Sequence, residues 1–321
     1  MIVYSGRTAW EFWQWIARTR SRFPETAYDL PKLPMESISL DEALLESEYF
    51  RKSGLIELLL SSDKFKHSPS KLRCVIRGCT FPNGSFCKLN SGIYVIAPRL
   101  LFLEYAFKHD LVETVYLGNR LASKFVIIDD ENSKLMKCDP LLEIDDVKSF
   151  LDKMDGYPGI KTARRASRYI VNEAESPMEI NVLMLLTLPR SLGGFGIPLP
   201  RMDYEIDVDK NQFPAYGKSS ARFDMYWKQG ALDVEYDSNQ FHSNPKKLEA
   251  DSIRRNVIKS MGYDVITVTS KEYRDLDSMI EIAQYISKKI GYRLRGLDIE
   301  WRSRAMMLVD KLSELSRNPF E

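Results

Sequence analysis

The chain has 321 residues, of which 44% are hydrophobic and 11% aromatic, so it can bury two cores of ordinary size. Its 46 basic and 45 acidic residues give a formal charge of +1, which excludes a generally basic nucleic-acid binder and requires any basic site to be local. No stretch approaches the ~18 apolar residues of a membrane-spanning helix, and the start lacks a secretory pattern. We therefore expect a cytoplasmic protein without membrane association.

Residues 1–150 are expected to form a mixed α/β region. Aromatic residues at helical spacing near the start, and longer apolar runs after them, predict helices, whereas short β-branched runs around a Pro-Asn-Gly turn predict strands. The predicted helices are TAWEFWQWIART, ALLESEYFRKSGLIELLL and RLLFLEYAFKHD, the predicted strands lie in SPSKLRCVIRGC and SGIYVIAP, and DLVETVYLGNRLASKFVIID is predicted to be helical or mixed.

Four cysteines, Cys74, Cys79, Cys87 and Cys138, leave two interpretations open. Three of them fall within RCVIRGCTFPNGSFC, which permits a zinc site, but the paired Cys-x-x-Cys spacing of structural zinc sites is absent. Free, mostly buried thiols are the favoured interpretation, because free cysteine commonly packs as a small hydrophobic residue.

A Gly/Pro-containing segment within residues 139–160 predicts a domain boundary. After it, residues 151–175 are expected to form a basic linker helix that carries Lys161, Arg164, Arg165 and Arg168 at helical spacing. Such a face can contact the phosphates of DNA, or it can simply be a solvated helix surface.

Residues 176–292 are expected to form a second domain, followed by a C-terminal helix over 293–321. Ser176, Pro177 and Glu179 have the spacing of a capping box, in which the Glu179 side chain reaches back to the Ser176 amide. The elements that follow are the strands MDYEIDVD, SARFDMYW and ALDVEYDS, the helix NPKKLEADSIRRNVIKSMG, the strand YDVITVTS and the helix DLDSMIEIAQYISKKIG. The middle two strands are close enough for an antiparallel hairpin, and the last strand can run parallel to ALDVEYDS. The predicted class is α/β (α+β), with a mixed sheet flanked by helices.

The stretch DVEYDSNQFH places Asp233, Glu235 and Asp237 at alternate positions, and therefore on one face of a strand. A two-residue turn at Gln229-Gly230, with glycine supplying a positive φ, sets Asp224 directly opposite Glu235. Like charges this close destabilise a sheet, so either proton uptake or a hard cation is expected to compensate them. A hard divalent cation, Mg²⁺ or Mn²⁺, suits such a group of carboxylates.

A different interpretation of the same acids is a solvated edge. In that case they balance the basic residues of the following helix, Lys246, Lys247, Arg254 and Arg255.

The segment from SPMEINVL through RFDMYWKQGALDVEYDSNQFH to ADSIRRNVIKSMGYDVITVTSKE, about residues 175–290, resembles the PD-(D/E)XK nuclease superfamily. Within that superfamily it is similar to the very-short-patch-repair-like endonuclease domains known as DUF559. The resemblance implies a restriction-endonuclease-like fold, metal-dependent cleavage of DNA, and a metal held by Asp224 and Glu235 with Glu179 approaching from its helix. It also implies that Lys246, Lys247, Arg254 and Arg255 lie beside the site and face DNA.

This sequence departs from the superfamily where Asp237 replaces the usual lysine. Water activation is then expected to pass to Asp237, His242 or Lys246, or else cleavage is lost. GRTAWEFWQW and GIYVIAPRLLFLEYAFKHDLVETVYLGNRL are similar to uncharacterised bacterial proteins, some labelled as relatives of abortive-infection antitoxins, which implies recognition, regulation or a partner protein from the same operon. The alternatives to an endonuclease are an inactive nuclease-fold DNA-binding or antitoxin-like regulator, and a protein-interaction module.

Overall fold

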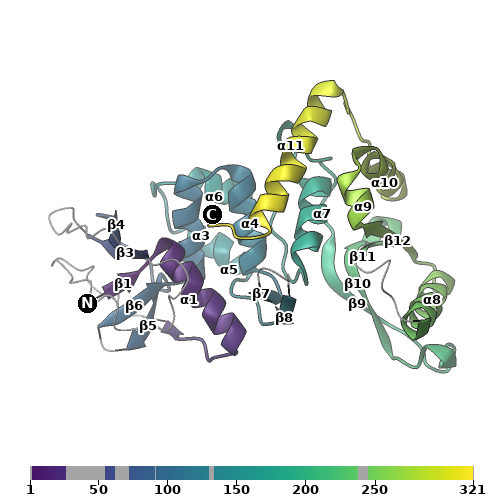
Figure 1. The fold of residues 1–321 in the computed structure, drawn as a ribbon, viewed down its shortest axis with the longest axis horizontal. Coiled ribbons are helices and arrows are strands. Elements are labelled where there is room, and N and C mark those ends of the chain that lie inside the picture. Colours follow the sequence, from purple (N-terminus) through teal and green to yellow (C-terminus); the bar gives the residue numbers. More distant parts are fainter. Residues whose placement is uncertain are drawn as a thin grey trace. The chain divides into compact units, whose positions relative to one another are not determined.

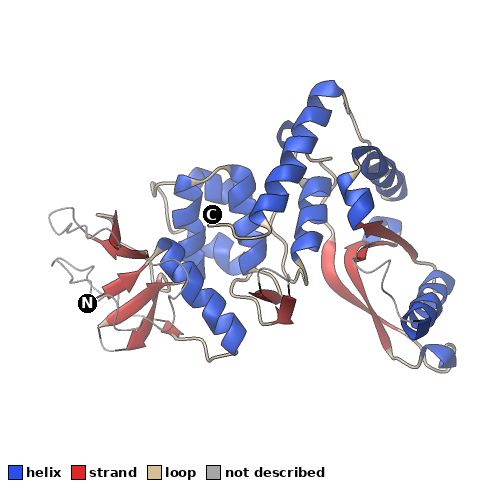
Figure 2. Ribbon diagram, in the orientation of Figure 1, coloured by secondary structure: helices blue, strands red, loops and turns tan. Residues whose placement is uncertain are grey.

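The computed structural model describes residues 2–26, 55–61, 72–90, 92–129, 134–237 and 245–320. The chain divides into two compact units, Met1–Ile170 with Phe320 and Val171–Pro319 with Glu321. Each unit combines helices with strands (Figures 1 and 2), which confirms the predicted α/β class. Among the described residues, no helix combines the length and the apolar character needed to cross a bilayer.

The first unit is built on a mixed sheet in the strand order β2-β5-β6-β1-β3-β4. Its central strand β1 runs parallel to β6 and antiparallel to β3, and β3 in turn runs parallel to β4. The strands are β1 (Ile2–Tyr4), β2 (Glu25–Thr26), β3 (Ile56–Leu60), β4 (Leu72–Ile76), β5 (Phe86–Asn90) and β6 (Ile93–Ile96). A separate hairpin pairs β7 (Phe125–Asp129) with β8 (Lys134–Lys137).

The helices of the first unit are α1 (Gly6–Thr19), α3 (Pro98–Lys108), α4 (Leu111–Leu121), α5 (Ile144–Leu151) and α6 (Ile160–Ala166). The predicted first helix is confirmed, and its buried aromatic side chains face the core. Trp13 is fully buried and donates its indole N–H to the Ile96 carbonyl 2.9 Å away, which fixes α1 to β6.

Two predictions for this half of the chain are wrong. Residues 56–60, expected in a helix, form the buried strand β3, because a short, mostly apolar segment, here interrupted by Glu57, fits a strand covered on both faces as well as a buried helix. Residues 43–54 of the same predicted helix lie outside the described residues. The expected linker helix at 151–175 is reduced to the seven-residue α6, which packs on α3 and α4 within the first unit.

The second unit has the predicted order of elements around a mixed sheet, β12-β11-β10-β9. In Figure 1, α7 lies on one side of this sheet and α8 on the other. The strands are β9 (Arg201–Asp207), β10 (Ser220–Trp227), β11 (Leu232–Asp237) and β12 (Asp264–Thr269). The helices are α7 (Pro177–Thr187), α8 (Pro245–Ser260), α9 (Ser270–Arg274), α10 (Leu276–Lys289) and α11 (Ile299–Leu315). Strands β10 and β11 are antiparallel and β11 and β12 parallel, as predicted.

The apolar core of the second unit holds α8 against the sheet. Ile206 of β9 and Phe223 of β10 pack with Val257 and Ile258 of the helix. On the side of α7, the buried Trp301 of α11 donates to the Gly194 carbonyl at 2.9 Å, so the predicted C-terminal helix is part of this unit.

The hairpin between β10 and β11 has the predicted register but a different turn. Met225 pairs with Val234 and Trp227 with Leu232, the register that places Asp224 opposite Glu235 at the next position, where the ladder ends. The connection is the short 3-10 helix Lys228–Gly230, and the positive φ of 46° belongs to Ala231 rather than to Gly230. Gly230 is instead required by close packing, because a Cβ there would lie 3.2 Å from the Lys289 carbonyl oxygen.

Candidate active site

Two carboxylates interrupt the regular pairing where the β10–β11 ladder ends. Asp224 accepts the backbone N–H of Tyr236 at 3.1 Å, and Asp233 accepts the backbone N–H of Met225 at 3.2 Å. Side chains thus take up amide groups that carbonyl oxygens would satisfy in a continuous ladder. The two strands hold both acids against the backbone.

Glu179 comes to the same region from the start of α7. Ser176 caps the helix by accepting the Glu179 N–H at 3.2 Å, as predicted. The Glu179 carboxylate, however, does not reach the Ser176 amide. It accepts the Ser176 hydroxyl and the Glu175 backbone N–H, both at 2.8 Å, so this part of the capping-box prediction is wrong.

The pKa values show that these acids act on one another. Burial, followed by the charge of Asp224, raises the pKa of Glu179 to about 7. Burial and then the charge of Glu235 raise the pKa of Asp224 to about 6. The pKa of Asp233 is raised well above its usual value by burial, by Glu235 and by Asp224. We call Glu179, Asp224, Asp233 and Glu235 the acid cluster.

Asp233 is the member of the acid cluster whose importance was missed from the sequence. The alternation placed it on the same face as Glu235 but gave no sign of its burial. Its exposed fraction is 0%, and within the described part of the chain its second carboxylate oxygen has no hydrogen-bond partner. A buried oxygen without a partner is costly and calls for an explanation.

One cation, Arg254 of α8, contacts the acid cluster. Its guanidinium forms an ion pair with Glu235 and donates to the Arg222 backbone carbonyl. Burial is the largest single influence and lowers the pKa of Arg254, but its charge interactions and hydrogen bond with Glu235, together with the charge of Asp233, raise the pKa overall. The structure thus gives Arg254 an internal partner, and its contact with a DNA phosphate stays a prediction.

The structure describes some of the remaining predicted site residues of this unit and not others. Asp237 pairs in register with Thr269 at the end of β11 and is half-buried. Arg255 is exposed on α8. His242 lies outside the described residues, as do the side chains of Lys246 and Lys247.

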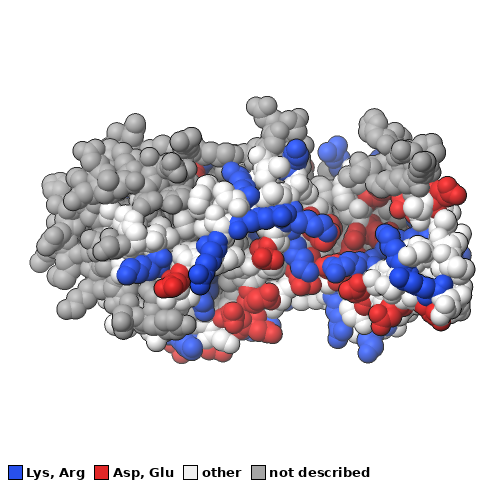
Figure 3. Space-filling view, turned by 90° about the horizontal axis from the view of Figure 1, so that it is seen from below, with Lys and Arg blue, Asp and Glu red and all other residues white. Residues whose placement is uncertain are grey.

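The four predicted cations of residues 161–168 belong to the first unit. Arg164 pairs with Asp155 at 2.6 Å, whereas Lys161, Arg165 and Arg168 are exposed. On the face drawn in Figure 3, acidic and basic side chains are interleaved rather than gathered into one field of positive charge.

The donor chemistry of the acid cluster fits a hard divalent cation. Carboxylate oxygens are the ligands that Mg²⁺ and Mn²⁺ prefer, and among the described residues Arg254 is the one cation that forms an ion pair with the cluster. Within the described residues, which include the whole acid cluster, no group of three or more His, Cys, Asp or Glu side chains is arranged to hold a metal. A divalent ion at the cluster would therefore be held by two carboxylates and water, as Mg²⁺ commonly is. All four cysteines are free thiols.

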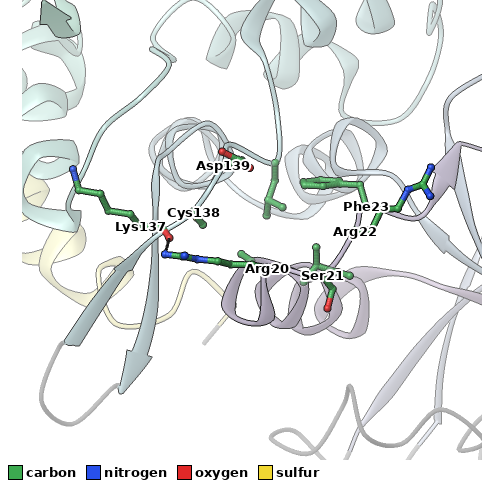
Figure 4. Close-up of a pocket in the computed structure, with 10 residues that line it drawn as sticks. Arg20, Ser21, Arg22, Phe23, Lys137, Cys138 and Asp139 are labelled. Atoms are coloured by element: carbon green, nitrogen blue, oxygen red, sulfur yellow. Dashed lines mark hydrogen bonds between the residues drawn. The ribbon is translucent and has the colours of Figure 1, made fainter.

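A separate pocket of about 520 Å³ lies in the first unit, between the end of α1 and β8 (Figure 4). Arg20, Arg22 and Lys137 line it, with Asp139 as the acidic counterpart. Arg20 donates to the Lys137 carbonyl at 3.5 Å. None of the predicted catalytic residues lines this pocket, whose positive side chains favour an anionic ligand.

The chain is similar to two uncharacterized proteins of Mycobacterium tuberculosis, one from each of two strains. Each is 23% identical to it over 129 residues, a match that covers 40% of this chain and 43% of the relative. The chain thus spans less than half the length of the curated relatives it matches. No protein-family model matches it, and no solved structure matches it significantly.

Proposed function

We propose that the second unit is a metal-dependent endonuclease domain that hydrolyses phosphodiester bonds of DNA in the bacterial cytoplasm. The observation that carries this proposal is the acid cluster, in which neighbouring carboxylates help to raise the pKa values of Glu179, Asp224 and Asp233, while the ion pair found among the described residues joins Arg254 to Glu235. Strongly perturbed acids that lack compensating charge are typical of functional sites rather than of structural ion pairs.

In this proposal Asp224 and Glu235 hold Mg²⁺ or Mn²⁺, and Glu179 and Asp233 add negative charge beside them. A bound divalent ion supplies an activated water and neutralises charge that develops on the phosphate. Asp237 and His242 are the candidates to orient that water. The resemblance of residues 175–290 to the PD-(D/E)XK superfamily supports the same roles.

The first unit is proposed to contribute recognition of DNA or of a partner protein. The basic pocket lined by Arg20, Arg22 and Lys137 supports binding of phosphate groups there. The exposed Lys161, Arg165 and Arg168 provide further positive charge on the same unit.

The test combines Mn²⁺ titration calorimetry with plasmid nicking on the full chain. Asp224→Asn keeps an acceptor for the Tyr236 N–H while it removes the charge, and Glu235→Gln removes the second proposed ligand. Both variants are expected to lose Mn²⁺ binding and nicking together. Asp207→Asn, an exposed acid of β9, is the matched control and should leave both unchanged. Wild-type nicking by purified Asp224→Asn would refute the assignment.

The second candidate is a nuclease-fold protein that binds DNA without cleaving it, as an antitoxin-like regulator would. Two observations favour it: Asp237 stands where the superfamily has lysine, and Arg254 already neutralises Glu235. This candidate predicts DNA binding that is the same in EDTA and in Mg²⁺, with no nicking in Mg²⁺, Mn²⁺ or Ca²⁺.

A further inference from the structure

We propose that Arg254 is an exchangeable counter-ion, which holds Glu235 in the absence of metal and turns to a DNA phosphate when the acid cluster is loaded. It would therefore couple metal binding to DNA binding. This inference rests on the proposed function, because it takes the acid cluster as the metal site.

The first support is the position of Arg254 among the charges. Three carboxylates lie within electrostatic reach of it: Asp224 from β10, and Asp233 and Glu235 from β11. Glu179 of α7 acts on the next carboxylate, Asp224. Among the described residues, Glu235 alone forms an ion pair with it, while the other end of its planar fork is held by the Arg222 carbonyl. Arg254 is thus attached to the cluster at one carboxylate, the one that is also a proposed metal ligand.

The second support is the partial exposure of the ion pair. The side chain of Arg254 is 21% exposed and that of Glu235 is 16% exposed, so both can exchange partners without unfolding. The Asp233 carboxylate, by contrast, is sealed within the protein. The pair lies at the accessible edge of the acid cluster, where a metal and a nucleic acid would arrive.

Competition for Glu235 follows from charge. Arg254 and a divalent cation both require the same carboxylate, and they repel each other at short distance. A guanidinium released from Glu235 presents the donor geometry that suits a phosphate, and its charge cannot be lost at any ordinary pH. Arg254 therefore weakens metal binding in the free protein and strengthens DNA binding in the loaded one.

The first measurement is Mn²⁺ titration calorimetry on wild type, Arg254→Gln and Lys259→Gln, with circular dichroism to verify folding. Arg254→Gln is expected to bind Mn²⁺ about tenfold more tightly than wild type, a coupling of ordinary size. Lys259→Gln removes an exposed charge from the same helix and should bind Mn²⁺ as wild type does. Equal or weaker binding by Arg254→Gln would overturn the inference, because Arg254 would then be positioning Glu235 instead of competing for it.

The second measurement is fluorescence anisotropy of a labelled DNA duplex in Ca²⁺ and in EDTA, with Ca²⁺ used as the metal probe. Wild type is expected to bind DNA about tenfold more tightly in Ca²⁺, and Arg254→Gln equally in both. Arg254→Lys covers the case in which the glutamine variant does not fold: it retains the charge, so Mn²⁺ affinity should stay within about twofold of wild type, while loss of the fork reduces the Ca²⁺ effect on DNA. An undiminished Ca²⁺ effect in Arg254→Lys would overturn the inference.

The two failures are distinguishable. If wild type binds Mn²⁺ and Arg254→Gln binds it no more tightly, the exchange is refuted while the proposed metal site stands. If neither protein binds Mn²⁺, the proposed function fails and the exchange fails with it.

Discussion

The two units bury acidic side chains in opposite ways. In the first unit, Glu104 accepts two hydrogen bonds from Arg77, at 2.9 and 2.6 Å, and a third from the Tyr157 hydroxyl. Glu57 lies 3.4 Å from Arg73 and 4.0 Å from Lys108. In the second unit, Arg254 forms an ion pair with Glu235 of the acid cluster, and the described residues show no ion pair for Glu179, Asp224 or Asp233.

The difference separates a structural use of charge from a functional one. An acid with its own cation holds the fold together, and removal of that cation leaves an uncompensated buried charge. An acid cluster with one cation holds like charges close together, which the fold tolerates and a divalent ligand would relieve. Four predictions test this contrast.

The largest effect is expected in the first unit. Arg77→Met leaves Glu104 buried without its cation, so the free energy of unfolding should fall by about 3–5 kcal/mol. Urea denaturation of the full chain at neutral pH measures the change. Lys148→Met removes a cation from an exposed pair with Asp145 and should shift stability by less than about 0.5 kcal/mol. An equal loss of unfolding free energy in Arg77→Met and Lys148→Met would contradict a structural role for the ion pair of Glu104.

The second unit should lose stability as pH rises. Glu179 and Asp224 have folded-state pKa values of about 7 and about 6, above those of the unfolded chain. Below about pH 4 both carboxyl groups are protonated in the folded and the unfolded chain, so they do not oppose folding. As pH rises through their folded-state pKa values, they destabilise the fold increasingly. The Glu179→Gln/Asp224→Asn double variant should remove about 2–4 kcal/mol of the loss that wild type shows between pH 4.5 and 7.5 in EDTA. If the unfolding free energies of wild type and the double variant changed with pH in the same way, the raised pKa values of Glu179 and Asp224 would be contradicted.

Asp233→Asn should separate stability from binding. Asparagine keeps an acceptor for the Met225 N–H and removes a buried charge, so unfolding should cost about 1–2 kcal/mol more at pH 7.5. Mn²⁺ binding should weaken at the same time, because the cluster becomes less negative. A variant that is less stable than wild type and binds Mn²⁺ normally would show that Asp233 has a structural role.

The smallest effect concerns the basic pocket of the first unit. The Arg20→Ala/Arg22→Ala double variant should bind DNA about three- to tenfold more weakly. The salt dependence of its DNA affinity should fall by the amount expected for the loss of about two phosphate contacts. Anisotropy titrations between 50 and 200 mM NaCl, about the range where such effects are resolved, provide the test. Lys148→Ala is the control for loss of an exposed cation from the same unit. If the dependence of DNA affinity on salt concentration is unchanged in the double variant, this pocket does not bind DNA.

The second unit was more predictable from sequence than the first because its signals are local. The Ser176 cap, the alternation around Glu235 and the short connection between the hairpin strands each depend on neighbouring residues. Strand β3 was misread because a strand buried on both faces has no alternation to reveal it. The role of Gly230 depends on the end of α10, far away in the sequence, and the ion pair of Arg254 depends on how α8 lies over the sheet.

The hairpin has a consequence for the order in which the second unit folds. Asp224 and Glu235 become neighbours as soon as the hairpin closes, which takes about 1–10 μs in isolated hairpins. Arg254 arrives later, because α8 must pack on the sheet and β12 must pair in parallel beyond it. Asp224 and Glu235 thus repel each other before Arg254 arrives to balance their charge. We expect this repulsion to slow closure of the hairpin, and divalent ions present during folding to speed it.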